Sequence, residues 1–201
     1  MDSGTVKTLG RRERRKLEVR ERILRAAIDC FLERGFDATT IDEIAERADV
    51  ARATVFNHFQ RKEAFLSAYF AERRQRLAAL IAEKLDGMAG ATTRLYAAFD
   101  LLADLNEEAP AETRELVGAW WRTGGSQATE PDTGRLLAEI VRQGQQQGEF
   151  RADLEPQLAG TLLLDAYVGT ILRWIATDPP PFPLGEALRD TCTTILHGLR
   201  R

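Results

Sequence analysis

The chain of 201 residues has few of the side chains that build disulfide frameworks, metal centres and catalytic sites. Its two cysteines, Cys30 and Cys192, lie far apart in segments expected to be helical, and its two histidines, His58 and His197, are equally distant. A disulfide framework is therefore not expected, which favours a reducing cytoplasm. Because no Ser or Cys pairs with His, no glycine-rich phosphate loop occurs and no Cys/His cluster has metal spacing, we expect no enzyme activity, no metal and no cofactor.

Long uninterrupted apolar runs and alternating strand-like runs are also absent. The longest apolar run, residues 158–175, contains Asp165 and Arg173, so we do not expect it to cross a membrane. No apolar stretch follows the basic residues near the N-terminus, so no signal peptide is expected. The hydrophobic content of 44% and charged content of 29% are those of a soluble globular protein, and Leu, Ala, Arg and Glu dominate. We therefore predict an all-α fold.

One stretch has the pattern of two short helices joined by a tight turn. An apolar stripe at helical spacing runs through residues 41–48, and Thr40 precedes it with Glu43 three residues later, which is a capping box. Residues 49–50 leave room only for a tight turn, and residues 51–59 form the second helix. This pattern is a helix-turn-helix, whose second helix is sized for the major groove of DNA.

In this stretch the chain resembles the tetracycline-repressor (TetR) family of transcriptional regulators. The resemblance is carried by the sequence TIDEIAERA from Thr40, by Val50 after the turn, by the T-hydrophobe-aromatic-x-x-F pattern of residues 54–59, and by Lys62 opening the next helix. It is tight over about residues 17–65. Beyond them it is architectural, with six further helices in a chain of the family's usual length.

Four positions depart from the pattern. Asp49 and Ala51 stand where the family often has the Gly of the turn and the Ser of the helix cap, and Ala53 stands at a frequent Gly. Phe56 replaces the usual Tyr and removes one hydroxyl contact to phosphate. The resemblance still implies the family's three-helix DNA-binding unit.

Three side chains near the start of the second helix are our candidates for reading bases. Arg52 and Thr54 lie where base edges come within reach, and Asn57 is a weaker third. The alternative for each is a solvated surface residue.

A second group of side chains is expected to face the sugar-phosphate backbone. The resemblance implies this role for Phe56, His58 and Lys62. Thr40 joins them because its hydroxyl lies at a helix N-terminus, where a phosphate oxygen is favoured. For Phe56 the alternative is packing on the first helix, and for the others a solvated surface position.

Charge and composition suggest a division into three parts. Through Lys62 the chain has 14 Lys/Arg and 11 Asp/Glu, a net +3, whereas the remainder has 14 and 20, a net −6. Residues 1–16 are rich in Arg and are expected to form a basic arm, disordered when free and ordered on DNA. Residues 17–62 form the DNA-binding domain, and residues 63–201 form the effector-binding and dimerisation domain.

The second half shows helical spacing in several further segments. We expect one long helix over residues 62–85, shared by two cores, with residues 72–76 interrupting its apolar stripe. The proline-rich residues 178–183 must break the chain. The further helices are expected over residues 93–107, 110–124, 131–147, 153–177 and 184–199.

The large side chains of the second half are candidates for an effector pocket. Aromatic residues at helical spacing are more often core than ligand site, but pockets between helices are commonly apolar with a few polar groups. Asp165, Arg122 and Arg173 are candidate polar partners. The resemblance implies a small, largely apolar effector whose binding shifts residues 62–85 and releases DNA. The pocket residues are Tyr96, Phe99, Leu102, Trp120, Trp121, Tyr167 and Trp174.

The segment 153–177 is apolar on two sides, and a helix of this kind needs two partners. We therefore predict a two-fold homodimer through this helix and residues 184–199, which together form a four-helix interface. The alternative is an internal helix wrapped entirely by its own chain. The expected interface residues are Leu163, Ile171, Leu188, Cys192, Ile195 and Leu199.

These features together predict an all-α homodimer of about nine helices per chain. Its partners are expected to be double-stranded DNA with a palindromic operator and a small-molecule effector, with no membrane involved. The most direct interpretation is a repressor released by its ligand. Two alternatives stay open at this point: a transcriptional activator of the same fold, and a helical bundle that binds a ligand or protein without binding DNA.

Overall fold

The computed structural model describes residues 10–125 and 132–199, and over these ranges the chain forms nine α-helices. The predicted all-α fold is confirmed. The chain divides into two compact units, Met1–Ala68 and Tyr69–Arg201. The boundary falls inside helix α4 (Glu63–Leu85), which is continuous through it.

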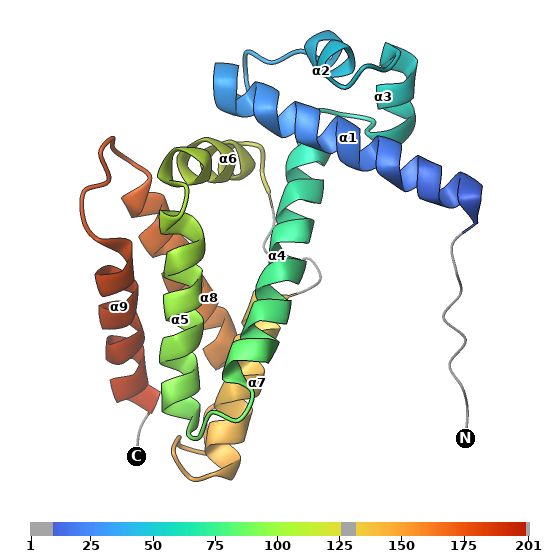
Figure 1. Cartoon of the computed structure of the whole chain (residues 1–201). Coiled ribbons are helices and arrows are strands. Elements are labelled where there is room, and N and C mark those ends of the chain that lie inside the picture. Colours follow the sequence, from blue (N-terminus) through green and yellow to red (C-terminus); the bar gives the residue numbers. More distant parts are fainter. Residues whose placement is uncertain (1–9, 126–131, 200–201) are drawn as a thin grey trace, which may run out of the picture. The chain divides into compact units, whose positions relative to one another are not determined.

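The first unit is a three-helix assembly closed by the first turns of α4. Figure 1 shows α2 and α3 on the same side of the long helix α1. Four buried phenylalanines make its core: the ring centroids of Phe31 and Phe36 lie 4.9 Å apart, and those of Phe59 and Phe65 lie 4.3 Å apart. Aromatic contacts at such distances add to the free energy of area burial. The helices are α1 (Arg11–Arg34), α2 (Ile41–Arg47) and α3 (Arg52–His58).

Helix α1 begins six residues before the expected position. Residues 11–16 were assigned to a basic arm because they carry no apolar periodicity, but they are helical. Arg, Lys and Glu are good helix formers, and the Glu13 carboxylate accepts a 3.0 Å hydrogen bond from the Gly10 N–H, which satisfies one free donor at the helix start. The rest of the predicted arm, residues 1–9, lies outside the described residues.

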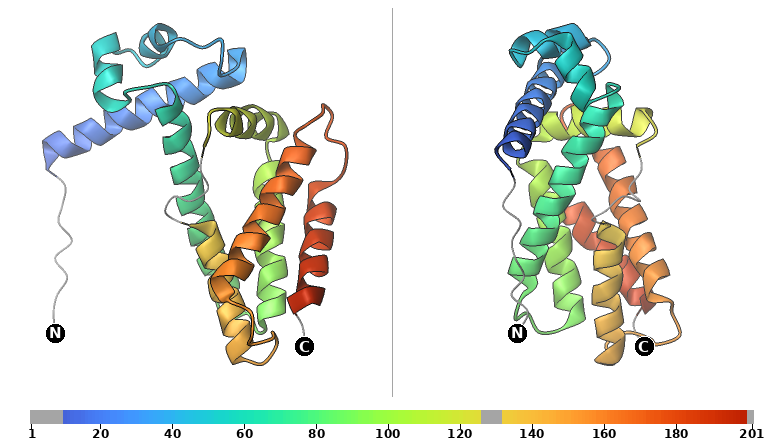
Figure 2. Two further views of the ribbon diagram at one scale, coloured as in Figure 1. Left: turned by 180° about the vertical axis from the view of Figure 1, so that it is seen from behind. Right: turned by 90° about the vertical axis from the view of Figure 1, so that its right-hand side faces the viewer.

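The second unit packs its helices around one apolar core. α7 lies against α8, and α5 and α8 both lie against α9, as the two views of Figure 2 show. Leu95, Leu137, Leu163 and Leu188 are fully buried in this core. Besides the end of α4, the unit contains α5 (Ala91–Glu107), α6 (Pro110–Arg122), α7 (Thr133–Gln146), α8 (Pro156–Trp174) and α9 (Leu184–Leu199).

The starts of α7 and α8 differ from the sequence-based expectation. α7 was expected from Pro131, which lies outside the described residues; the helix is capped by Asp132, whose Oδ1 accepts a 2.9 Å hydrogen bond from the Gly134 N–H. α8 was expected to begin at Asp153, but it begins at Pro156 and is capped by Glu155, whose carboxylate accepts a 2.5 Å hydrogen bond from the Leu158 N–H. Several acidic residues precede α8, and sequence does not show which of them caps it.

Helices α7 and α8 approach each other backbone to backbone. A methyl group placed on Gly160 of α8 would lie 2.3 Å from the Gly134 carbonyl oxygen and 2.6 Å from the Ala138 nitrogen, both on α7. Only glycine fits a contact this close.

Three further features concern the described residues as a whole. No helix among them has both the length and the hydropathy of a membrane span. No three His, Cys, Asp or Glu side chains among them are grouped to hold a metal ion. Cys30 and Cys192 are both free and buried, and burial raises the pKa of the Cys192 thiol to about 12.

Candidate DNA-binding surface and effector pocket

The helix-turn-helix is closed at its start by the expected capping box. The Thr40 Oγ1 accepts a 3.3 Å hydrogen bond from the Glu43 N–H, and a Glu43 carboxylate oxygen accepts one of 2.8 Å from the Thr40 N–H. The Thr40 hydroxyl itself donates to the same carboxylate at 3.0 Å. In the free chain the hydroxyl proposed for a phosphate is therefore already in use within the cap.

The turn between α2 and α3 depends on an unusual backbone conformation at Asp49. Its φ is +51°, the only positive φ at a non-glycine residue among those described. Asp is one of the few residue types that tolerate this region. The Val50 N–H then donates a 3.0 Å hydrogen bond to the Ala45 carbonyl, which closes the turn. The departure from Gly at this position thus leaves the turn intact.

Helix α3 is anchored on one side and accessible on the other. Val55 is fully buried, whereas Arg52, Phe56 and Asn57 are exposed and Thr54 is half-buried. Phe56 is 39% exposed, so it is not part of the buried core of the first unit. An exposed large aromatic residue between two exposed polar side chains is a surface suited to a partner.

Arg52 has two neighbours within this surface. Its guanidinium forms a 2.5 Å ion pair with the Asp42 carboxylate of α2 and lies 5.5 Å from the centre of the Phe56 ring. Both charged side chains are more than half exposed. Exposed ion pairs contribute little to stability, so Arg52 can exchange Asp42 for another partner at little cost.

Lys62 makes internal contacts that the sequence does not indicate. Its ammonium donates hydrogen bonds to the main-chain carbonyls of Phe36, Asp37 and Thr39, at 2.7, 3.1 and 3.1 Å. The Nζ also lies 4.5 Å from the centre of the Phe36 ring. All three N–H donors of the ammonium are thus directed at the connection between α1 and α2.

His58, at the end of α3, lies in the electrostatic field of two basic residues of α1. Burial is the main cause of the lowered pKa of its imidazole, and the positive charges of Lys16 and Arg20 lower it further. The Arg20 guanidinium stacks over the Phe59 ring at 4.4 Å. Sequence patterns did not single out Lys16 and Arg20 beside α3, because one was placed in the arm and the other on an ordinary helix surface.

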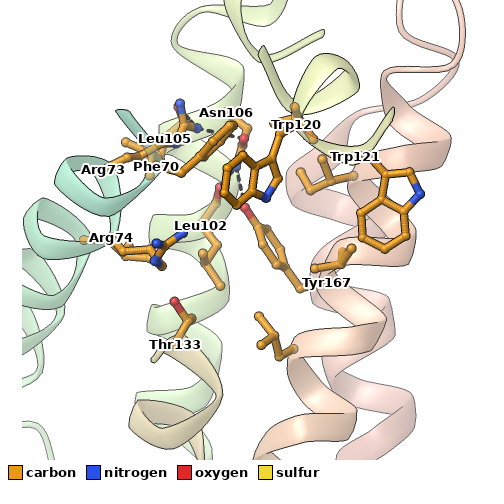
Figure 3. Close-up of a pocket in the computed structure, with 15 residues that line it drawn as sticks. Phe70, Arg73, Arg74, Leu102, Leu105, Asn106, Trp120, Trp121, Thr133 and Tyr167 are labelled. Atoms are coloured by element: carbon orange, nitrogen blue, oxygen red, sulfur yellow. Dashed lines mark hydrogen bonds between the residues drawn. The ribbon is translucent and has the colours of Figure 1, made fainter. Parts of the chain in front are cut away.

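The second unit contains a pocket between α4, α5, α6, α7 and α8, with about 630 Å³ of empty space that is partly open to solvent. Figure 3 shows the side chains that line it. Four of the seven predicted residues, Leu102, Trp120, Trp121 and Tyr167, are among them. The other apolar lining residues are Phe70, Leu77, Leu105, Val117, Leu164, Val168 and Ile171.

Three predicted pocket residues lie elsewhere in the unit. Phe99 and Trp174 are buried in the apolar core, and Tyr96 joins α5 to α9 through a 3.0 Å hydrogen bond between its hydroxyl and that of Thr193. Arg122, Asp165 and Arg173, the expected polar partners, are exposed and do not line the pocket. When several helices share one core, helical spacing in the sequence does not show which aromatic residues lie in the core and which line a pocket.

The charged and amide side chains of the pocket come from α4 and α5 instead. Arg73 donates to the Leu105 carbonyl at 3.0 Å and to the Asn106 Oδ1 at 2.8 Å. The Asn106 Nδ2 donates to the Tyr167 hydroxyl at 3.0 Å. Burial raises the pKa of that hydroxyl, which stays protonated. Arg74 is the remaining charged lining residue.

These polar residues were not predicted, because residues 72–76 have the pattern of an interruption in the apolar stripe. The usable signal was the adjacent pair Arg73 and Arg74 between two apolar segments of one helix. Whether Arg73 and Arg74 point into the bundle or out of it depends on how the helix is rotated about its axis, which the sequence does not show.

The residues expected at a dimer interface mostly face inward. Leu163, Ile171, Leu188 and Cys192 are buried in the core of their own chain. Ile195 is half-buried, and the side chain of Leu199 lies outside the described residues. The outward apolar residues of α8 are Leu158 and Leu162, which are 57% and 53% exposed. The helix thus has two apolar sides, and on the side assigned to a partner Leu163 and Ile171 are buried within the chain itself.

Comparison with known proteins agrees with this geometry. Residues 23–69 match the family described as "Bacterial regulatory proteins, tetR family". The chain is 26% identical over 178 residues to the HTH-type transcriptional repressor DhaR of Mycobacterium sp. (strain GP1), a match covering 77% of this chain and 81% of that one.

Solved structures give the same result over a greater length. FadR of Thermus thermophilus, a TetR family transcriptional repressor crystallised with lauroyl-CoA, is 31% identical, with a TM-score of 0.73 over 90% of this chain and 96% of that chain. FadR of Bacillus subtilis, crystallised with stearoyl-CoA, is 19% identical and has a TM-score of 0.69 over 90% and 99% of the two chains, which shows a shared fold. The chain therefore belongs to the TetR family and is a DNA-binding regulator of transcription.

Proposed function

We propose that the chain represses transcription in the cytoplasm by binding a palindromic operator as a homodimer, and that a small effector in the pocket of the second unit releases it. The observation that carries the proposal is the accessible outer face of α3, which presents Arg52, Phe56 and Asn57 on a helix held by the buried Val55. A short helix anchored on one side is the usual reader of the major groove.

The DNA contacts are divided between bases and backbone. Arg52, Thr54 and Asn57 read base edges, and Arg52 leaves the exposed Asp42 carboxylate to do so. Phe56 and His58 face the sugar-phosphate backbone. Thr40 contacts a phosphate only if its hydroxyl gives up the hydrogen bonds of the cap. Lys62 either gives up its bonds to main-chain carbonyls or acts through its positive charge and by holding the unit together.

The homodimer is formed by the outward face of α8 together with α9. Leu158 and Leu162 lie one helical turn apart and are more than half exposed, so a partner chain that covers them removes apolar area from water. A two-fold axis through this face pairs α8 with its own copy, which is the commonest symmetry among soluble homo-oligomers. Residues 17–62 then read DNA, and residues 63–201 bind the effector and the partner.

The effector acts through α4. This one helix carries Phe65 in the core of the first unit and Phe70, Arg73, Arg74 and Leu77 in the pocket lining of the second. A ligand that displaces the pocket segment of a continuous helix biases the DNA-binding end as well. Relatives support a ligand of this kind, because the two FadR structures contain acyl-CoA molecules.

Selection of bound sites from random DNA tests the proposal. The expected result is an enriched palindrome whose half-sites are separated by about one helical turn or a multiple of it. Enrichment of a single asymmetric half-site would contradict the dimer, and no enrichment at all would contradict the regulator itself.

A further inference from the structure

Arg74 is a buried cation that has no hydrogen-bond or ion-pair partner among the residues that the structure describes. Its residue surface is 7% exposed, and its Nε makes no hydrogen bond. Among residues 10–125 and 132–199 the guanidinium forms neither a hydrogen bond nor an ion pair. The adjacent Arg73, by contrast, is fixed by Leu105, Asn106 and the Tyr69 hydroxyl. Buried charges in proteins are normally paired, so Arg74 requires an explanation.

Trp120 supplies a second unpaired donor in the same pocket. It is 5% exposed, and its indole Nε1 has no hydrogen-bond partner among the described residues. Figure 3 shows the Arg74 guanidinium and the Trp120 indole N–H directed toward the middle of the pocket from α4 and α6. Two buried donors on different helices thus lack acceptors in one cavity.

The pocket itself offers no anion to either donor. Its lining residues include Arg73 and Arg74 but no Asp or Glu. The acid whose charge acts on Arg74 is Asp132, whose Oδ1 accepts hydrogen bonds from the N–H groups of Gly134 and Arg135 at the start of α7 and which forms no ion pair with Arg74 among the described residues. The surrounding surface is apolar, with Leu102, Val117 and Ile171 among its members.

Leaving a charge unpaired in such surroundings is unfavourable. Burial lowers the pKa of the Arg74 guanidinium, and the Asp132 carboxylate opposes this only in part. A guanidinium does not lose its proton at neutral pH, so the desolvation penalty remains in the free protein. A bound anion relieves it and accepts hydrogen bonds that are stronger than those between neutral groups.

We propose that Arg74 and the Trp120 indole N–H bind the anionic group of an amphipathic acyl ligand whose hydrocarbon part lies against Leu102, Val117 and Ile171. This inference rests on the proposed function, because it names the chemical class of the effector. The anion is either the carboxylate of a free acyl acid or a phosphate of an acylated carrier. The cavity itself measures about 60 Å³, and the larger empty space of about 630 Å³ includes open solvent, so the pocket must widen to hold the hydrocarbon part.

Direct binding measurements with matched ligands test the charge requirement. The probes are decanoate, decanoyl-CoA and the neutral decan-1-ol, titrated by calorimetry into the full-length protein and into Arg74→Met. Arg76→Met is the control, because Arg76 is an exposed cation on the same helix.

The anionic probes should bind the unaltered protein at least tenfold more tightly than decan-1-ol. Arg74→Met should weaken the better anionic probe by about 10- to 100-fold, the loss expected for a hydrogen bond to a charged group, and leave decan-1-ol unchanged. Trp120→Phe, which keeps an aromatic ring and removes the N–H, should weaken the same probe about fivefold or more. Arg76→Met should change nothing.

Thermal unfolding of the ligand-free protein separates a ligand-binding arginine from a structural one. Because Arg74 is buried without a partner, Arg74→Met should raise the melting temperature, whereas loss of a structural arginine would lower it. Added decanoate or decanoyl-CoA should stabilise the unaltered protein and not the variant. A lower melting temperature for the variant, together with equal losses for anionic and neutral probes, would overturn the inference.

The two probes also identify the source of the anion. Arg74-dependent binding of decanoate points to a free carboxylate, and such binding of decanoyl-CoA alone points to a carrier phosphate. If an anion binds through Arg74 but the operator complex is unaffected, the inference stands and release by the effector fails. If only neutral ligands bind and they release DNA, the proposed function stands and the inference fails.

Discussion

The ammonium of Lys62 donates a 2.7 Å hydrogen bond to the main-chain carbonyl oxygen of Phe36 and lies over the ring of the same residue. Two further hydrogen bonds reach the carbonyls of Asp37 and Thr39. A residue that sequence assigns to phosphate contact thereby joins the start of α4 to the connection between α1 and α2. It holds the helix-turn-helix together before DNA is present.

Lys62→Ala should therefore reduce both folding stability and DNA binding. A hydrogen bond to a charged group is worth about 1.5–3 kcal/mol, and we expect a loss of about 2–3 kcal/mol because the three carbonyls regain water on removal of the amine. Urea unfolding measures this loss, with the exposed Arg61→Ala as control. Affinity should fall equally for operator and random DNA, with a smaller salt dependence. Unchanged stability would mean that the carbonyl contacts contribute nothing.

Arg52→Ala should act on sequence choice and not on the fold. A side chain that reads a base edge discriminates by about 1–3 kcal/mol at one base pair. The exposed Asp42 ion pair that it loses contributes little to stability, so urea unfolding should be nearly unchanged. Site selection with the variant should show relaxed preference at one position of each half-site. An equal loss on specific and random DNA would assign Arg52 to the backbone instead.

His58 should make DNA binding sensitive to pH. Its pKa is lowered in the free protein, so the imidazole is neutral at pH 7. A neighbouring phosphate favours the protonated form, so the complex takes up a proton and affinity should rise as the pH falls from about 7.5 to 6. Fluorescence anisotropy at constant ionic strength measures this rise. His58→Asn should flatten it, and His197→Asn, at an exposed position in α9, should not.

The same imidazole should affect folding in the opposite direction. The unfolded chain has the higher pKa and binds the proton first as the pH falls. The stability contribution of neutral His58 is thus fully present above about pH 6.5 and is lost as the pH drops through the lower folded value. Urea unfolding between pH 7.5 and 5 should show a component that disappears in His58→Asn. If this part of the free energy of unfolding instead increased as the pH falls, a carboxylate would have to lie beside the imidazole.

Asp49 should respond differently to two small substitutions. At φ +51° alanine meets a steric penalty of about 1 kcal/mol that glycine avoids. Asp49→Ala should therefore destabilise the first unit by about that amount, and Asp49→Gly should leave it unchanged or slightly more stable. Thermal unfolding of the two variants measures the difference. Equal melting temperatures would mean that the turn relaxes to another conformation.

Leu162→Arg should dissociate the dimer. Leu162 is more than half exposed in the single chain, so the substitution is tolerated there, but a charge inside a dimer interface is costly. Sedimentation velocity should show monomers for this variant and dimers for the control Met88→Arg, an exposed apolar residue away from α8. Monomers of the unaltered protein at micromolar concentration would contradict the proposed interface.

The helix-turn-helix could be predicted because its helices are short and amphipathic and only residues 48–51 lie between them. Apolar spacing there assigns Val55 to the inside and Arg52 to the outside without ambiguity. α8 is different: its periodicity shows two apolar sides, but the choice between core and partner depends on where α7 and α9 lie. Leu163 was assigned to a partner chain for that reason but is buried in its own chain, whereas Leu162, one residue away, is exposed.

Polar residues inside the bundle were the hardest to foresee. Arg74 reads as part of a solvated stretch, because charged residues are rarely buried without a partner. Its position follows from the phase of a 23-residue helix and from the packing of α5 and α6 beside it. The start of α1 was predicted too late for a related reason, because a helical turn made only of charged residues shows no apolar periodicity.

The contact of Gly160 with Gly134 has a mechanical consequence for the pocket. Where two helix backbones touch, neither helix can slide or rotate past the other without a collision of main-chain atoms. The pocket wall that contains Thr133 and Leu164 is accordingly stiff. Ligands of different lengths must be accommodated by the opposite wall, where the ring centroids of Phe70 and Trp120 lie 5.1 Å apart. Because the wall formed by α7 and α8 is stiff and the opposite wall can yield, the cavity should expand toward α4.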